Sequence, residues 1–137
     1  MRMLLATLAL SILPIVASTP SVNAQEAPQF MKDTFPQEAV KPAWQEFQDV
    51  MNPKGALDAK TKELIGLGVA AQIPCQYCVY YHTLAAKHAG ATDAQIKEAI
   101  AAAALVRKWS TVLNGTDYDM AKFKKEVDSV FVTGKTD

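Results

Sequence analysis

The feature that most restricts the fold of this chain is a run of 23 residues, 64–86, with no formal charge unless its histidine is protonated. Pro74 divides the run, and Gln72, Gln76 and His82 also lie within it. These residues argue against a transmembrane helix, which needs about 20 predominantly apolar residues. The run therefore predicts two consecutive core helices buried on most sides, with part of their surface expected at a subunit interface.

The composition is that of a foldable globular protein, and it excludes several classes of function. The 137 residues are 50% hydrophobic and 20% charged, which argues against a disordered or low-complexity chain. The 14 basic and 14 acidic side chains cancel, so the chain lacks the basic excess typical of a nucleic-acid-binding protein. We expect one domain with no nucleic-acid partner.

Residues 1–24 have the pattern of a secretory signal peptide: Arg2, an apolar centre, and small residues before the cut. Cleavage is expected between Ala24 and Gln25, which leaves a mature chain of residues 25–137. An uncleaved membrane anchor is the alternative, but the apolar run is short and contains a proline. The protein is therefore expected in the periplasm or outside the cell, without a membrane partner after cleavage, and both places permit disulfides.

Helical periodicity and capping signals predict an all-α fold of five helices, and no segment shows the period-two alternation of a strand. Asp58 is expected to cap the second helix, and Gly90 to end the third in a left-handed conformation. Thr92 and Gln95 form a capping box for a long fourth helix, whose small apolar stripe would let a neighbouring helix approach closely. The expected segments are an irregular lead-in at 25–36 and helices at about 42–51, 58–73, 75–88, 93–114 and 117–131. A first region, 25–56, would precede a helical domain at 57–137.

Four residues form a candidate redox site with the spacing Glu-x11-Cys-x2-Cys-x3-His. Cys75 and Cys78 lie on one face at a helix start, where they can form a reversible disulfide and where the helix dipole stabilises a thiolate. His82 follows one turn after Cys78 and can accept a thiol proton. Glu63 lies on the preceding helix, on the strip of Leu67 and Ala70, where its carboxylate can orient the histidine.

Two other readings of this pattern remain open, and two are rejected. The cysteines could form a purely structural disulfide, which is normal in exported proteins, or ligate zinc together with His82 and Glu63. Haem attachment needs a histidine directly after the second cysteine, where this chain has Val79. A thioredoxin motif should follow a strand, whereas a helix is expected here. Tyr77 lies between the cysteines and could offer a hydroxyl to the site. Other polar or aromatic residues of this region are assigned structural roles by default: Tyr80, Tyr81, His88, Arg107 and Trp109.

Three segments carry a family resemblance between about residues 57 and 115. They are Leu57-Asp58-Ala59-Lys60-Thr61-Lys62-Glu63-Leu64-Ile65, then Cys75-Gln76-Tyr77-Cys78-Val79-Tyr80-Tyr81-His82, then Gly90-Ala91 with Ile96. In these segments the chain resembles the carboxymuconolactone decarboxylase and alkylhydroperoxidase D-like family. Members are small all-helical proteins that assemble as trimers or hexamers, so the resemblance implies a homo-trimer or homo-hexamer.

The resemblance also implies roles for the four site residues. In the alkylhydroperoxidase-like members the second cysteine attacks the peroxide, the first resolves it as a disulfide, and a Glu and a His relay the proton. Carried over to this chain, Cys78 attacks, Cys75 resolves, and Glu63 and His82 form the relay. The position of His82 one turn after Cys78 also favours Cys78 as the attacking cysteine. No cofactor and no metal are expected.

The chain departs from its peroxidase relatives in two ways. Tyr77 stands where the best-known members have a histidine, and those members draw electrons from a lipoyl-bearing partner that an exported protein would not meet. The thiol reductant is therefore unknown. Decarboxylases of the family lack the cysteine pair, which disfavours decarboxylation. Three hypotheses follow: a hydroperoxide-reducing thiol peroxidase, a disulfide oxidoreductase, and a non-catalytic helical oligomer with a structural disulfide or zinc site.

Overall fold

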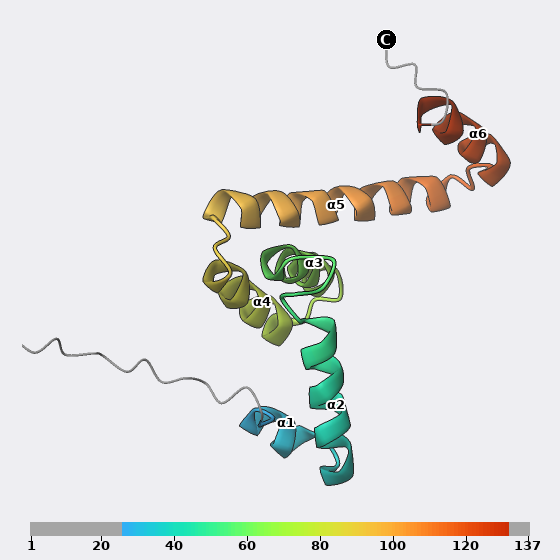
Figure 1. Cartoon of the computed structure of the whole chain (residues 1–137). Helices are drawn as coiled ribbons and strands as arrows, with labels where there is room; N and C mark the ends of the chain where they lie inside the picture. Colours follow the sequence, from blue (N-terminus) through green and yellow to red (C-terminus); the bar gives the residue numbers. More distant parts are fainter. Residues whose placement is uncertain (1–25, 132–137) are drawn as a thin grey trace, which may run out of the picture. The chain divides into compact units, whose positions relative to one another are not determined.

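The computed structural model describes residues 26–131, and every regular element in that range is an α-helix. The all-α class expected from the sequence is confirmed, whereas the expected leader at residues 1–24 lies outside the described range. The helices are α1 (Gln29–Thr34), α2 (Gln37–Val50), α3 (Ala59–Gln72), α4 (Gln76–His88), α5 (Asp93–Gly115) and α6 (Met120–Phe131) (Figure 1).

The chain divides into two compact units between Gln45 and Glu46, inside α2. The domain boundary expected at residues 56/57 stays a prediction. No helix within residues 26–131 is long and apolar enough to cross a membrane.

The first unit corrects the expectation of an irregular lead-in and of five helices. Its helix α1 is held by local bonds: the Gln29 side chain donates to the Asp33 carboxylate at 2.8 Å, and the Thr34 hydroxyl donates to the Phe30 carbonyl at 2.7 Å. Helix α2 also begins at Gln37, earlier than the expected start at Pro42, which lies inside it. Pro42 is the sixth residue of α2, beyond the first turn, so it removes one backbone hydrogen bond and the helix continues past it at that cost.

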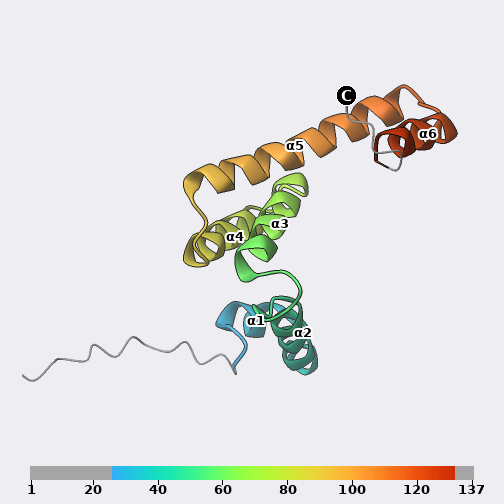
Figure 2. The ribbon, with the colours of Figure 1, turned by 45° about the horizontal axis from the view of Figure 1, so that its top comes forward.

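The core of the second unit consists of α3, α4 and α5. Helix α3 packs against both of the others, and α3 and α4 lie side by side beneath α5 in both ribbon views (Figures 1 and 2). Leu67 on α3 is fully buried, and Ala70, Ala86 and Ile96 are buried with it in the core. Burial of such side chains provides most of the stability of a small helical domain.

Small residues let α3 and α5 approach closely, as expected from the stripe of the long helix. A Cβ placed on Gly68 of α3 would lie 3.4 Å from the Cβ of Ala103 on α5. The Gln72 side chain amide, one turn further along α3, donates to the Ala103 carbonyl at 2.8 Å. These contacts fix α5 across α3.

The expected helix ends are confirmed by their capping groups. The Asp58 carboxylate accepts the Thr61 backbone N–H at 2.8 Å and begins α3. Thr92 and Gln95 form both bonds of the capping box that begins α5. Gly90 has φ = 84°, a left-handed conformation that favours glycine after a helix.

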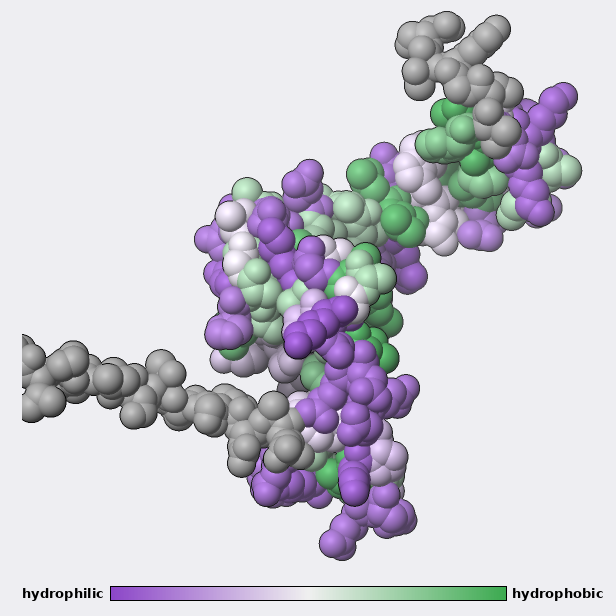
Figure 3. Space-filling model, in the orientation of Figure 1, coloured by the Kyte–Doolittle hydropathy of each residue, from purple (hydrophilic) through white to green (hydrophobic). Residues whose placement is uncertain are grey.

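The expectation that the two central helices are buried on most sides is wrong for a single chain. Ile65 and Val69 on α3 and Ile73 at its C-cap are exposed, and so are Tyr77, Tyr80 and Leu84 on α4. On the face drawn in Figure 3, apolar patches lie among hydrophilic residues over the part that contains α3 to α5. The core of α3, α4 and α5 covers one side of α3 and α4, and the other helices of residues 26–131 leave these apolar side chains exposed.

Candidate functional site

The two cysteines form a disulfide at the start of α4. Cys75 is the N-cap residue of the helix and Cys78 lies in its first turn, with the two Cα atoms 5.3 Å apart and the sulfurs bonded at 2.08 Å. The backbone N–H of Cys75 donates to the Ala70 carbonyl at 3.1 Å, which anchors the start of α4 to the end of α3. The expected pairing of the two sulfurs on one helix face is confirmed.

The sulfur of Cys75 also occupies the N-cap position that an oxygen usually fills. It accepts a hydrogen bond from the backbone N–H of Cys78 at 3.2 Å. The unpaired N–H groups at a helix start stabilise negative charge, so this position favours a thiolate on Cys75 after reduction. Both cysteines are half-buried, and the expectation that Cys75 is the more accessible sulfur stays a prediction.

Glu63 and His82 form a hydrogen-bonded pair between α3 and α4. His82 Nδ1 lies 2.7 Å from Glu63 Oε2, and the two side chains are 19% and 11% exposed. Glu63 lies on the buried strip of α3 with Leu67 and Ala70, as the sequence predicted. An ionised carboxylate only accepts hydrogen bonds, so Nδ1 is the donor of this bond, and in the neutral imidazole the lone pair of Nε2 is then left to act as a base.

Two residues that the sequence analysis did not assign to the site also contact the imidazole of His82. A Cβ placed on Gly66 would lie only 2.5 Å from Cε1 and 2.7 Å from Nδ1 of the ring. Tyr81 packs edge-on against the ring with a centroid distance of 5.2 Å, and Phe47 packs against Tyr81 at 6.0 Å. A glycine inside a helix, unfavourable by propensity, was the one sequence signal for Gly66.

Tyr81 lies in the electrostatic field of this pair. Burial raises the pKa of its phenol, and the negative charge of Glu63 raises that pKa further. The phenol therefore stays protonated at neutral pH. The default structural role of Tyr81 agrees with its packing, whereas Tyr77 and Tyr80 are 80% and 70% exposed and are not core residues of the single chain.

The four predicted site residues thus fall on two adjacent elements. The structure joins Cys75 to Cys78 and Glu63 to His82, and it places His82 one turn beyond Cys78 on α4. In this oxidised state the cysteine sulfurs are bonded to each other and offer no thiolate to a metal. Within residues 26–131 no group of three or more His, Cys, Asp or Glu side chains is arranged to hold an ion.

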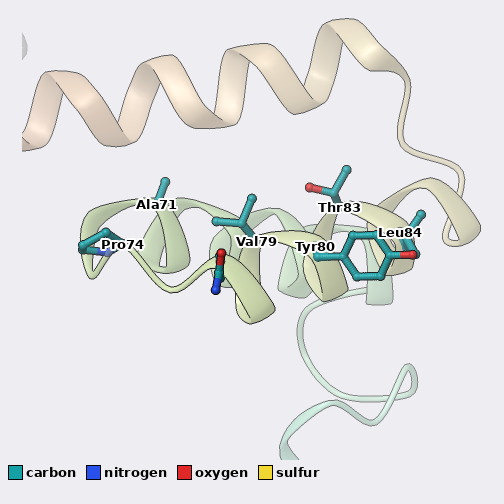
Figure 4. Close-up of a pocket in the computed structure, with 7 residues that line it drawn as sticks. Ala71, Pro74, Val79, Tyr80, Thr83 and Leu84 are labelled. Carbon is teal, nitrogen blue, oxygen red and sulfur yellow. The ribbon is translucent and has the colours of Figure 1, made fainter.

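An open apolar groove of about 590 Å³ lies where the end of α3 meets α4, and neither cysteine is among its lining residues. The side chains of Ala71, Val79 and Thr83 point to one side of the two helices in Figure 4. Pro74 and Gln76 flank Cys75 in the sequence, and Val79 directly follows Cys78, so the groove is lined by the chain segment that carries the redox pair. The lining residues are Ala71, Pro74, Gln76, Val79, Tyr80, Thr83 and Leu84.

Comparison with known proteins identifies relatives for the part of the chain that contains this site. The sequence model of the carboxymuconolactone decarboxylase family matches residues 38–118. The crystal structure of the alkylhydroperoxidase AhpD core from Rhodospirillum rubrum superposes with a TM-score of 0.58 at 32% identity, covering 61% of this chain and 62% of that one.

A curated relative also matches over part of its length. "Uncharacterized protein 4 in cox locus" from Paracoccus denitrificans is 47% identical over 53 residues, which are 39% of this chain. The match spans 48% of that protein, about half of its length.

Proposed function

Because this chain belongs to the carboxymuconolactone decarboxylase family and contains a cysteine pair beside a Glu–His pair, we propose that it is a thiol-dependent peroxidase. The family includes peroxidases and decarboxylases, and its decarboxylases lack the cysteine pair. The neighbouring crystal structure of an alkylhydroperoxidase core supports the same choice. The substrate is a hydroperoxide, and the chemistry uses no cofactor.

The observation that carries this proposal is the 2.7 Å contact between His82 Nδ1 and Glu63 Oε2. A structural disulfide does not require a buried carboxylate that fixes the tautomer of a histidine one turn away. Removing a carboxylate and an imidazole from water costs free energy, which paired hydrogen bonding only partly offsets. We therefore assign the buried Glu63–His82 pair the role of a proton relay for the cysteines.

The reaction proceeds in two steps, each with its proton accounted for. His82 Nε2 accepts the Cys78 thiol proton, directly or through a water, and the thiolate attacks the outer oxygen of the hydroperoxide. The S–O bond forms as the O–O bond breaks, and the leaving alkoxide takes the proton from the imidazolium. The products are an alcohol, or water from hydrogen peroxide, and a sulfenic acid on Cys78.

Cys75 completes the cycle. The Cys75 thiol gives up its proton and its thiolate attacks the sulfur of the Cys78 sulfenic acid; the S–O bond breaks, and the hydroxide leaves as water with that proton. The product is the Cys75–Cys78 disulfide that the structure contains. An external thiol or dithiol then returns two electrons and two protons. The groove where α3 meets α4 is apolar and is lined by sequence neighbours of both cysteines, which favours hydroperoxides with an organic chain over hydrogen peroxide.

Single-turnover kinetics of the reduced chain test this assignment. Cys75→Ser should still react once with an organic hydroperoxide and accumulate sulfenic acid on Cys78, which a dimedone adduct reports by intact mass. Cys78→Ser should lose that turnover. A full burst in Cys78→Ser together with its loss in Cys75→Ser would reverse the roles of the two cysteines.

A second function, disulfide oxidoreductase, is favoured by one observation. The Cys78 N–H donates to the Cys75 sulfur at 3.2 Å, which stabilises Cys75 as the attacking or leaving thiolate in thiol–disulfide exchange. The reduced chain is therefore mixed with a model disulfide as well as with the hydroperoxide. Faster oxidation by the disulfide, lost in Cys75→Ser, supports this function. If neither reagent oxidises the pair and both variants only unfold earlier, the disulfide is structural.

Export and assembly complete the proposal. The signal-peptide pattern of residues 1–24 supports a periplasmic or secreted protein that begins at Gln25, and the intact mass of the exported form tests this. The exposed apolar side chains of α3 and α4 support assembly into an oligomer, and the family resemblance implies that it is a homo-trimer or homo-hexamer.

A further inference from the structure

Gly66 lies at the centre of α3, three residues after Glu63, in a position where helix propensity favours alanine. A Cβ built on its backbone would lie 2.5 Å from Cε1, 2.7 Å from Nδ1 and 2.8 Å from Nε2 of the His82 imidazole. Real Cβ atoms do not approach other heavy atoms this closely. The ring thus occupies the space that a side chain at position 66 would fill.

We propose that Gly66 is a positioning residue, whose missing side chain lets His82 lie against α3 with Nδ1 on the Glu63 carboxylate. This inference rests on the proposed function for its consequence, because the Nδ1–Oε2 bond is what leaves Nε2 as the base. The geometric part of the inference, that Gly66 permits the bond, stands on the contact distances alone.

The imidazole has little freedom to yield to a methyl group. Its Nδ1 is held by the Glu63 carboxylate at 2.7 Å, and Tyr81 packs edge-on against the ring. The added Cβ would contact Nδ1 itself, so the ring must move away from the backbone of α3. That movement breaks the hydrogen bond that fixes the tautomer.

Gly68, a second glycine on α3, provides a comparison because an added side chain there would not meet the imidazole. At Gly68 an added Cβ would meet the Ala103 Cβ at 3.4 Å, an ordinary van der Waals contact. Gly68→Ala therefore raises helix propensity by the same amount without touching His82, and it is the matched control for Gly66→Ala.

The first test observes the hydrogen bond and does not depend on activity. In the full oxidised chain, ¹⁵N NMR of the imidazoles should show His82 as the Nδ1–H tautomer with a downfield Nδ1 proton. This signature should be lost in Gly66→Ala and kept in Gly68→Ala. If Gly66→Ala keeps the signature, the inference is wrong, whatever the activity.

A double variant covers the case in which Gly66→Ala does not fold. In the His82→Ala background the space beside position 66 is empty, so Gly66→Ala should fold and unfold at the same temperature as His82→Ala or slightly higher. If the double variant is also unfolded, position 66 needs glycine for a reason other than the imidazole, and the inference fails.

The kinetic test separates this inference from the proposed function. Gly66→Ala should lower the single-turnover rate with hydroperoxide to within about threefold of His82→Ala, and should add nothing in the His82→Ala background. If the parent chain has no peroxidase activity but the NMR signature changes as expected, the proposed function fails and the positioning role stands. If the parent is active and Gly66→Ala matches the parent rate, the positioning role fails.

Discussion

Replacing Glu63 by glutamine is the sharpest test of the relay. The amide has almost the same shape as the carboxylate and its oxygen can still accept the His82 Nδ1 proton, so the packing of α3 against α4 should survive. What the substitution removes is the negative charge 2.7 Å from the imidazole. That charge stabilises the imidazolium which forms when Nε2 takes the Cys78 proton, so Glu63→Gln should slow the attack on hydroperoxide.

The size of the effect follows from the distance and the burial. Two unit charges about 4 Å apart attract by about 4 kcal/mol at an effective dielectric constant of about 20. The side chains are only 19% and 11% exposed, so water screens them weakly. The remaining amide dipole recovers part of the attraction, and we expect a loss of about 1.4 to 2.7 kcal/mol, which is roughly 10- to 100-fold in rate. This lies at or below the low end of the roughly 10²–10⁴-fold range that general-base assistance contributes.

The assay is stopped-flow oxidation of the fully reduced chain by excess organic hydroperoxide at pH 7, followed by loss of free thiol. Glu98→Gln, an exposed carboxylate on α5, is the control for the change in net charge and should match the parent rate. Circular dichroism should show equal helix content in all three proteins. A rate for Glu63→Gln within about threefold of the parent would refute the relay.

Three further predictions concern stability and assembly. Leu67→Ala should lower the free energy of unfolding by about 2–5 kcal/mol in urea titration, because Leu67 is fully buried. Leu57→Ala, at an exposed side chain, should lower it far less. Equal losses in the two variants would contradict the assigned core. The bond from the Thr61 backbone N–H holds the pKa of Asp58 below its ordinary value of 3.8, so the cap stabilises the fold above that pH and loses its contribution as the pH falls through the folded pKa. Urea midpoints at pH 3 and pH 6 should therefore differ more in the parent than in Asp58→Ala. Light scattering should give a trimer or hexamer, and a monomer at micromolar concentration would contradict the assembly.

The sequence alone determined the helix ends and the face on which the site lies. Asp58, Thr92 and Gly90 act through bonds or backbone conformations within four residues, so local rules are sufficient to place them. The buried strip that includes Glu63 and Leu67 also follows from helical periodicity, because residues three and four apart share a face. The first unit is an exception to this agreement. Hydrogen bonds within α1 stabilise a helix there, although the sequence has no apolar periodicity that predicts one.

The tertiary structure decided which side chains meet. Glu63 and His82 are 19 residues apart, and only the crossing of α3 and α4 brings Nδ1 and Oε2 to 2.7 Å. The same packing of α4 on α3 places the His82 imidazole against Gly66. Helical spacing cannot predict this contact, because the two residues lie on different helices. It also leaves Ile65 and Val69 exposed, since one helix offers only one face to a partner. Local hydrogen bonds fix where helices begin and end, whereas distances between helices depend on how their surfaces pack, and the site consists of such distances.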